Sequence, residues 1–313
     1  MIRRAADIYR GPDLFPPQNG PISAIRRNWV KAEKAMALEY HMPRADLRDH
    51  VRAYYYFATD KRAVQPIYAE MGNLRVILSG GGIMHTPDGG RQEISSAYLL
   101  GPTMGAYCME AEAGTRVFGI GIRPKGWISL CGVSAEEATD RIIDLTAFAG
   151  GLARSAVDEI RNAGSIAEMA GAADRFFLQI LAKQAARRAA AYPEALARWL
   201  LNPDDLGLDE LVSQMDVSRR QTDRIAKLYF GASPKYLQRK YRALRAADRI
   251  RAGETDWLAA AGGCYYDQSH FIKEFKTFVG VTPKQFIGNQ ASLITEIQAQ
   301  RRAQSLSLPL ASF

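Results

Sequence analysis

The apolar positions of residues 208–230 predict two short helices separated by a turn. The stripe of the first helix is formed by Leu208, Leu211, Val212 and Met215. Asp216 and Val217 interrupt this period. Ser218 is suited to cap the second helix, because its hydroxyl accepts hydrogen bonds from the free amides of the first turn. That helix is predicted from about Arg219 to Tyr229. A supporting helix, a tight turn and a second helix together make a helix-turn-helix unit.

The same pattern returns in residues 256–286. The stretch WLAAAGGC precedes Asp267, which is predicted to cap a helix with Phe271, Phe275 and Phe278 on its apolar side. The connecting helix, LQRKYRALRAADRI, can turn its apolar stripe inward: Leu237, Tyr241, Leu244, Ala247 and Ile250. Its basic residues are left for solvent or phosphate: Arg239, Lys240, Arg242 and Arg245. The C-terminal region is therefore predicted to hold two helix-turn-helix units joined by one long helix.

Residues 38–130 show short runs rich in β-branched and aromatic side chains instead. The runs are RAYYYFAT, LRVILS, ISSAYLLG, GAYCMEA and TRVFGIGI, and turn signals such as Ser79–Gly82 separate them. Strands of this length and spacing are typical of an antiparallel sandwich or small barrel. Helical patterns follow in AEEATDRIIDL, LARSAVDEIRNA, IAEMAGAADRFFLQILAKQAARRAAA and EALARWLL. The predicted fold class is α+β, with an N-terminal β-rich, barrel- or sandwich-like domain carrying helices and a C-terminal all-α domain.

These patterns divide the chain into four segments. Residues 1–36 are predicted to be an extension, disordered or partly helical, because Gly and Pro interrupt any regular element. An upstream start with Met36 as the natural first residue is the alternative. Residues 37–190 form the predicted sensor or dimerisation domain, and residues 191–290 form the helical domain. Residues 291–313 are predicted to be a flexible tail.

Charge is concentrated in the first unit and the connecting helix. The whole chain has a formal net charge of +8. Between Ser218 and Arg251, eleven Lys or Arg residues stand against only Asp223 and Asp248. A basic segment of this kind favours a polyanionic partner such as double-stranded DNA, although a solvated basic face would look the same.

Other sequence features bear on compartment and chemistry. The three cysteines are far apart and odd in number, which favours a reducing cytosol. The sequence contains no apolar run of about 18 residues, so it predicts no membrane span. The four histidines form no HxH or HxxxH pair, and Ser79–Gly82 lacks the Lys that a P-loop needs. We therefore expect a cytoplasmic protein with no catalytic residues, no cofactor and no bound metal. A cupin-like enzyme with an accessory helical domain is the alternative, and a bound metal would favour it.

The outer face of each second helix supplies the candidate DNA-binding residues. In the first unit these are Arg219, Arg220, Asp223, Arg224 and Lys227, followed by Lys235. Arg220 and Arg224 are the base-reading candidates, because Arg can bond the O6 and N7 edge of guanine at two points, whereas Lys227 and Lys235 suit phosphates. In the second unit the candidates are Gln268, Ser269, His270 and Lys273. A capping or surface role is the alternative for His270.

Two motifs carry a resemblance to a known family. VSRRQTDRIAKLYFGASPKYLQRKYR and YYDQSHFIKEFKTFVGVTPKQF resemble the DNA-binding domain of the AraC/XylS transcriptional regulators. The resemblance implies two recognition helices in successive major grooves, with Arg220, Asp223 and Arg224 at the reading positions of the first helix. The resemblance likewise places four residues at the reading positions of the second helix: Gln268, Ser269, His270 and Lys273. RNA polymerase is a common partner in this family.

The N-terminal region resembles a regulatory domain from one branch of that family. The likeness lies in RADLRDHVRAYYYF, AYLLGPTM and GIGIRPKGWISLCGVSAEEATDRIIDL. It implies control by a small-molecule effector, whose identity the sequence does not give, or by self-association, with a homodimer as one form.

The second unit departs from the family pattern. Cys264 stands where Gly is usual, and Gly262 and Gly263 stand where helix formers are expected, each at a cost of about 0.5–1 kcal/mol relative to Ala. This predicts a locally soft second unit, and a regulator that has lost DNA reading there is a further alternative. In the first unit, Asp216 replaces a common Gly at the turn, and Asp tolerates the left-handed conformation.

Two features of the β region have open interpretations. Arg75, in the apolar run LRVIL, is expected at the surface or rim, with pairing to a ligand as the alternative. The aromatic residues Tyr54, Tyr55, Tyr56, Phe57 and Trp127 are expected to be core, with a pocket lining as the alternative.

Overall fold

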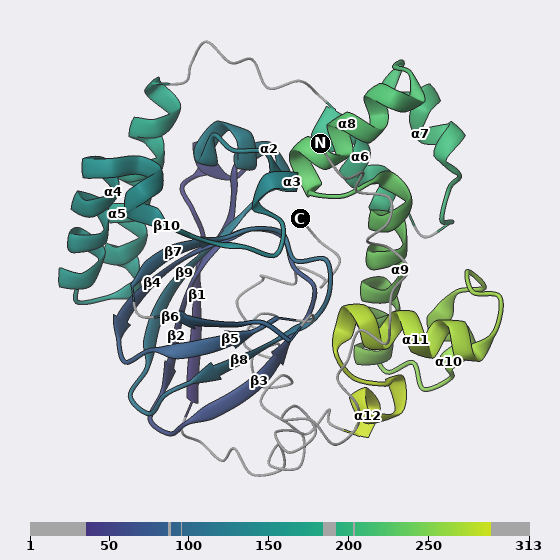
Figure 1. Ribbon diagram of the computed structural model, residues 1–313, viewed down its shortest axis with the longest axis horizontal. Helices are drawn as coiled ribbons and strands as arrows, with labels where there is room; N and C mark the ends of the chain where they lie inside the picture. Colours follow the sequence, from purple (N-terminus) through teal and green to yellow (C-terminus); the bar gives the residue numbers. More distant parts are fainter. Residues whose placement is uncertain (1–35, 87–88, 95, 184–191, 203, 289–313) are drawn as a thin grey trace, which may run out of the picture.

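The computed structural model describes residues 36–86, 89–94, 96–183, 192–202 and 204–288. A β-rich part with helices on one side lies beside an all-helical part (Figure 1). The predicted tail lies outside the described residues. So does the predicted extension, apart from Met36, where the first strand begins.

In the described residues, ten strands form two antiparallel sheets. The first sheet has the order β1 (Met36–His41), β2 (Val51–Thr59), β9 (Arg116–Ile122), β4 (Asn73–Ser79), β7 (Ala97–Leu100) and β10 (Ile142–Asp144). The second has the order β3 (Ala63–Ile67), β8 (Tyr107–Ala111), β5 (Gly82–His85) and β6 (Arg91–Ile94). The predicted α+β class and its antiparallel β architecture are confirmed, and each of the five predicted strands is present.

The sequence analysis missed the five remaining strands, β1, β3, β5, β6 and β10. One of them, β3, contains Pro66, which lacks the N–H that a central strand must donate. β3 lies at the edge of its sheet, where the missing donor is tolerated.

Alternation along β4 shows how the first sheet uses its two faces. Leu74 and Val76 belong to the core beneath the helices α4 (Leu145–Asn162) and α5 (Ile166–Lys183), which cover the outer face (Figure 1). Arg75 and Ile77, between and beyond them, line a cavity between the sheets. The outer face of β4 therefore packs against the helices, whereas its inner face lines the cavity.

The aromatic residues of β2 divide in the same way. Tyr54 and Trp127 are fully buried in the core under the helices, and Tyr56 packs against that core. Tyr55 and Phe57 line the cavity instead. Gly119 on β9 leaves room for Tyr55, because a Cβ built there would lie 1.9 Å from Cζ of the tyrosine ring.

One helix prediction in this part is wrong. Residues 135–145 were expected to be helical, but α3 (Ala135–Ala138) ends early and Ile142–Asp144 forms β10 against β7. Asp140 takes a positive φ of 57° and breaks the helix. The β-branched pair after it favours a strand. The other short helices are η2 (Ala45–Leu47), α2 (Pro124–Gly126) and η3 (Trp127–Cys131).

The helical part contains both predicted helix-turn-helix units. Its helices are α6 (Tyr192–Leu201), α7 (Leu208–Met215), α8 (Arg219–Phe230), α9 (Pro234–Arg251), α10 (Trp257–Ala261), α11 (Gln268–Val279) and α12 (Pro283–Gly288). The units α7–α8 and α10–α11 lie at the two ends of α9 (Figure 1). The 18 residues of α9 give it a length of about 27 Å. Phe271, Phe275 and Phe278 are fully buried, as predicted.

The two parts are joined by hydrogen bonds as well as by packing. The ammonium of Lys240 on α9 donates to the carbonyl oxygens of Glu70 (2.9 Å) and Thr103 (2.7 Å). The Tyr236 hydroxyl donates to the Met104 carbonyl (2.6 Å). Lys240 is fully buried, so the prediction that it faces solvent or phosphate is wrong.

The three cysteines are free thiols, and Cys108 and Cys131 are buried. Among the described residues, no helix is both long and apolar enough to cross a membrane.

Candidate nucleic-acid interface

The start of α8 is fixed by the local chemistry that the sequence predicted. Asp216 ends α7 in the left-handed conformation, with φ 50°. The Ser218 hydroxyl accepts from the Gln221 amide (3.2 Å), and the Gln221 side chain accepts from the Ser218 amide (3.0 Å). This reciprocal pair is a capping box. It sets the direction in which the first turn of α8 presents its side chains.

Arg220 and Arg224 occupy one exposed face of α8, four residues apart. Both side chains are exposed, and within the described part of the chain neither makes an ion pair. Arg219 is also exposed, but it is paired with Asp209 of α7. Of the three arginines in the first turns, the two assigned to base reading are therefore the ones with their guanidinium groups uncommitted.

Asp223 and Lys227 form an ion pair one turn further along (3.4 Å). Lys227 also reaches Glu136 of α3, in the β-rich part (3.3 Å). Partial burial lowers the pKa of Lys227, but the two carboxylates outweigh this and raise it above its ordinary value. A phosphate contact by Lys227 would have to compete with Glu136. Lys235, at the start of α9, is exposed and has no ion pair in the described chain.

The start of α11 is capped as predicted. The Asp267 carboxylate accepts from the His270 amide (2.7 Å). Gln268, Ser269 and Lys273 are exposed. His270 is exposed too, but its Nε2 lies 3.3 Å from the Glu274 carboxylate and its ring lies against Tyr265. The four candidates of the second unit thus share one accessible end of α11.

The predicted weakness of the second supporting helix is corrected by the structure. α10 ends at Ala261, and Gly262 is its C-cap with φ 64°. Gly263 also has a positive φ, 71°. The glycines therefore lie in the turn, where the left-handed conformation suits them, and the cost of a glycine inside a helix does not apply. Cys264 follows in the same turn.

Most of the remaining basic run has structural partners. Arg242 and Arg245 both bond the carboxylate of Asp205 (2.5 and 3.1 Å). Arg239 pairs with Glu274, which is itself buried. The prediction that Arg242 and Arg245 are left for solvent or phosphate is wrong, whereas Arg239 remains exposed beside its partner. Their partners lie 35 to 40 residues away in the sequence. No local pattern marks such pairs.

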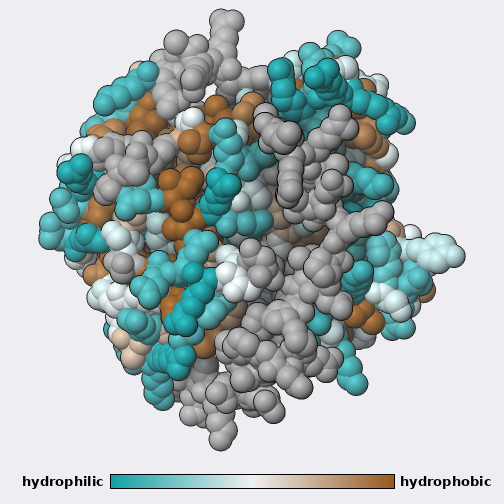
Figure 2. All heavy atoms as spheres, viewed as in Figure 1, coloured by the Kyte–Doolittle hydropathy of each residue, from teal (hydrophilic) through white to brown (hydrophobic). Residues whose placement is uncertain are grey.

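The opposite ends of both recognition helices lie against the β-rich part. The Thr139 hydroxyl donates to the carbonyl of Gly231, just after α8 (3.2 Å). The amides of Ala69 and Ala106 donate to the carbonyls of Phe278 and Thr277 near the end of α11 (2.8 and 2.9 Å). The N-terminal ends remain accessible, and hydrophilic side chains gather at the upper right over α7 and α8 (Figure 2). In helix-turn-helix proteins those ends reach the base edges.

Comparison with known proteins bears on this geometry. The model of a family described as "Helix-turn-helix domain" matches residues 211–289. Residues 211–289 form an AraC-type helix-turn-helix domain. A second family, described as "Domain of unknown function (DUF6597)", matches residues 39–144.

Part of the chain is similar to a curated regulator. The HTH-type transcriptional regulator GbdR of Pseudomonas aeruginosa is 29% identical over 82 residues. The match covers 26% of this chain and 22% of GbdR, so the chain spans about a fifth of the length of that relative. Because this relative is a transcriptional regulator, the comparison does not favour the alternative of a cupin-like enzyme.

Solved structures resemble the chain more loosely. ToxT of Vibrio cholerae aligns with 82% of this chain and 98% of its own, at a TM-score of 0.44 and 12% identity. The AraC-like transcriptional activator CuxR aligns with 70% of this chain and 88% of its own, at a TM-score of 0.31 and 15% identity.

Proposed function

We propose that the protein is a transcriptional regulator that binds specific double-stranded DNA sites through α8 and α11. The observation that carries this proposal is the selective exposure of the basic run. Most of its cations are committed to ion pairs or buried, whereas Arg220, Arg224 and Lys235 are exposed without an ion pair in the described chain. Because these cations are not used in ion pairs within the protein, they are available to bind DNA.

The roles follow from position on the helices. Arg220 and Arg224 would read guanine edges from the exposed face of α8, because a guanidinium bonds both O6 and N7. Gln268 and Lys273 would read bases from α11, with Ser269 and His270 beside them. Arg219, Lys227 and Lys235 would contact phosphates, and Asp223 would hold Lys227 in position. The two units, at the ends of the roughly 27 Å helix α9, would occupy neighbouring major grooves, which are about 34 Å apart on one DNA face.

The β-rich part would control this binding. A small-molecule effector or self-association as a homodimer would act there, in the cytoplasm, and contact with RNA polymerase would turn binding into regulation. In this account the protein carries no catalytic site.

Replacing Lys235 with Ala is expected to weaken binding to all DNA sequences alike. A phosphate contact carries no base information. Each lost contact makes the negative slope of log K against log salt less steep by about 0.9. Fluorescence anisotropy over a series of salt concentrations measures this slope. Arg175→Ala, which removes an exposed cation from α5, is the control and should leave the slope unchanged. Loss of affinity for one sequence only would contradict the phosphate role.

A further inference from the structure

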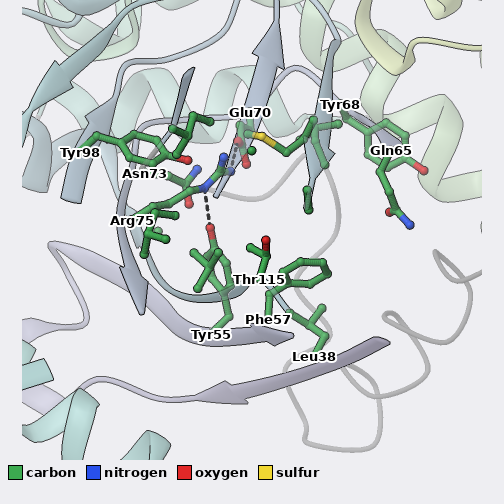
Figure 3. A pocket seen from close by; sticks show the side chains of 18 of the residues that line it. Leu38, Tyr55, Phe57, Gln65, Tyr68, Glu70, Asn73, Arg75, Tyr98 and Thr115 are labelled. Atoms are coloured by element: carbon green, nitrogen blue, oxygen red, sulfur yellow. Dashed lines mark hydrogen bonds and ion pairs between the residues drawn. The ribbon is translucent and has the colours of Figure 1, made fainter. Parts of the chain in front are cut away.

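A cavity of about 280 Å³ lies between the two sheets of the β-rich part. Apolar side chains from both sheets line most of it, among them Leu38, Phe57, Ile67, Ile77, Met109 and Val117. Figure 3 shows a polar group of side chains around Arg75 on its wall, with Gln65 and Thr115 further away. Its size is near the lower end of the range for small-molecule sites, about 300–1,000 Å³.

Arg75 is held by partners within the wall. The prediction of a surface or rim position is wrong, since the residue is only 8% exposed. Its Nε donates to the Tyr55 hydroxyl (2.8 Å). Its Nη2 donates to the Glu70 carboxylate (2.7 Å) and to the Tyr107 hydroxyl (3.0 Å). Tyr107 in turn donates to the same Glu70 oxygen (2.5 Å).

This arrangement neutralises the wall before any ligand arrives. The charge of Arg75 is matched by Glu70. Arg52 is the other guanidinium among the lining residues, and it also has a partner. Glu110 is matched by Arg62, and His85 Nε2 lies 3.3 Å from its carboxylate. An anionic ligand would meet the Glu70 carboxylate beside Arg75 and would lose its hydration without gaining an unpaired cation. An uncharged molecule meets no such penalty.

The same wall is in contact with the DNA-binding part. Glu70 points its carboxylate at Arg75 while its carbonyl accepts from Lys240 of α9. Its neighbour Met71 also lines the cavity and belongs to the core of the helical part. The amide of Ala69 donates to the end of α11. A ligand that displaces this segment therefore displaces contacts to both the connecting helix and the second recognition helix.

We propose that the cavity binds an uncharged, largely apolar small molecule and that residues 69–71 convey its presence to α9 and α11. The ligand class is inferred from the cavity alone, whereas the effect of the ligand on DNA binding rests on the proposed function. Glu70 is the positioning residue in this account, because it keeps Arg75 neutralised and also meets Lys240.

Two dyes that share one skeleton test the ligand class. N-phenyl-1-naphthylamine is uncharged, and 1-anilinonaphthalene-8-sulfonate is the same molecule with an added sulfonate. Titration of the full chain, followed by dye fluorescence, is expected to show at least a roughly tenfold preference for the uncharged dye. Glu70→Gln keeps the shape of the side chain but leaves Arg75 unmatched, so the preference should fall about tenfold or reverse.

Two further variants keep the test decisive. Met109→Trp fills the cavity and should abolish binding of the uncharged dye, which separates the cavity from other apolar surface. Arg75→Met leaves Glu70 unmatched and should weaken binding of the sulfonate further. A wild-type preference for the sulfonate, an unchanged preference in Glu70→Gln, or dye binding that survives Met109→Trp would each overturn the proposal.

The dye titrations contain no DNA, so they do not depend on the proposed function. Binding of a selected DNA fragment, measured first without dye, tests the proposed function by itself. The coupling is then measured by adding the uncharged dye to the protein–DNA complex, where we expect a change of at least about threefold in DNA affinity in the wild type and none in Met109→Trp. Dye binding with unchanged DNA affinity would overturn the coupling and leave the ligand class standing.

Discussion

Replacing both Arg220 and Arg224 with Ala is expected to remove nearly all sequence-specific DNA binding while the protein stays folded. Each well-placed guanidinium contributes about 1–3 kcal/mol of discrimination, so the pair should cost about 2–6 kcal/mol. That is roughly 30-fold to 20,000-fold in affinity for the preferred site. Both side chains are exposed and make no ion pair in the described chain, so their loss removes no internal contact of that kind.

The measurement is fluorescence anisotropy with the preferred fragment and with a scrambled fragment of the same length. Affinity for the scrambled fragment should fall much less, because non-specific binding depends on total charge. The charge-matched control is Arg154→Ala with Arg175→Ala, on the helices that cover the far side of the β-rich part. An equal loss on both fragments, or a loss in the control, would contradict base reading by α8.

Replacing Lys240 with Met is expected to remove a pH dependence of stability in the alkaline range. Burial lowers the pKa of Lys240 to about 8, against the opposing charges of Asp140 and Glu70. In the unfolded chain the group keeps its proton up to its ordinary pKa, near 10.4. Between these values unfolding takes up a proton, so stability rises with pH. Below the folded pKa both states are charged, and the folded state bears the full cost of the buried charge.

The wild type should therefore gain about 2–3 kcal/mol of unfolding free energy relative to Lys240→Met between about pH 7 and pH 10. Urea unfolding at a series of pH values, followed by tryptophan fluorescence, measures the difference. Lys235→Met changes an exposed lysine on the same helix and should show no such trend. A constant difference between wild type and Lys240→Met would mean that the buried ammonium does not titrate in this range.

Local features were predicted well from the sequence because local chemistry decides them. Ser218 and Asp267 cap their helices, and Asp216 takes the left-handed conformation, as expected. The inward stripe of α9 and the buried phenylalanines of α11 follow directly from helical spacing. These are the features that identify the two units.

The errors arise where distant residues decide the outcome. Lys240 was expected at the surface, and only the carbonyls of Glu70 and Thr103, more than 130 residues away, make its burial tolerable. Arg75 was expected at the rim for the same reason, since its partners Tyr55 and Tyr107 lie 20 and 32 residues away. Gly262 and Gly263 were placed inside a helix because a sequence does not show that α10 stops after five residues.

The central claim is that two recognition helices read DNA together, and selection of bound fragments from random DNA tests it most directly. The full chain would be used at near-physiological salt, alongside Arg220→Ala and Gln268→Ala. The account predicts a motif of two short boxes about one helical turn, roughly 10–11 base pairs, apart. Arg220→Ala should blur one box and Gln268→Ala the other. A single box that Gln268→Ala leaves intact, or salt-sensitive binding without any motif, would contradict the claim.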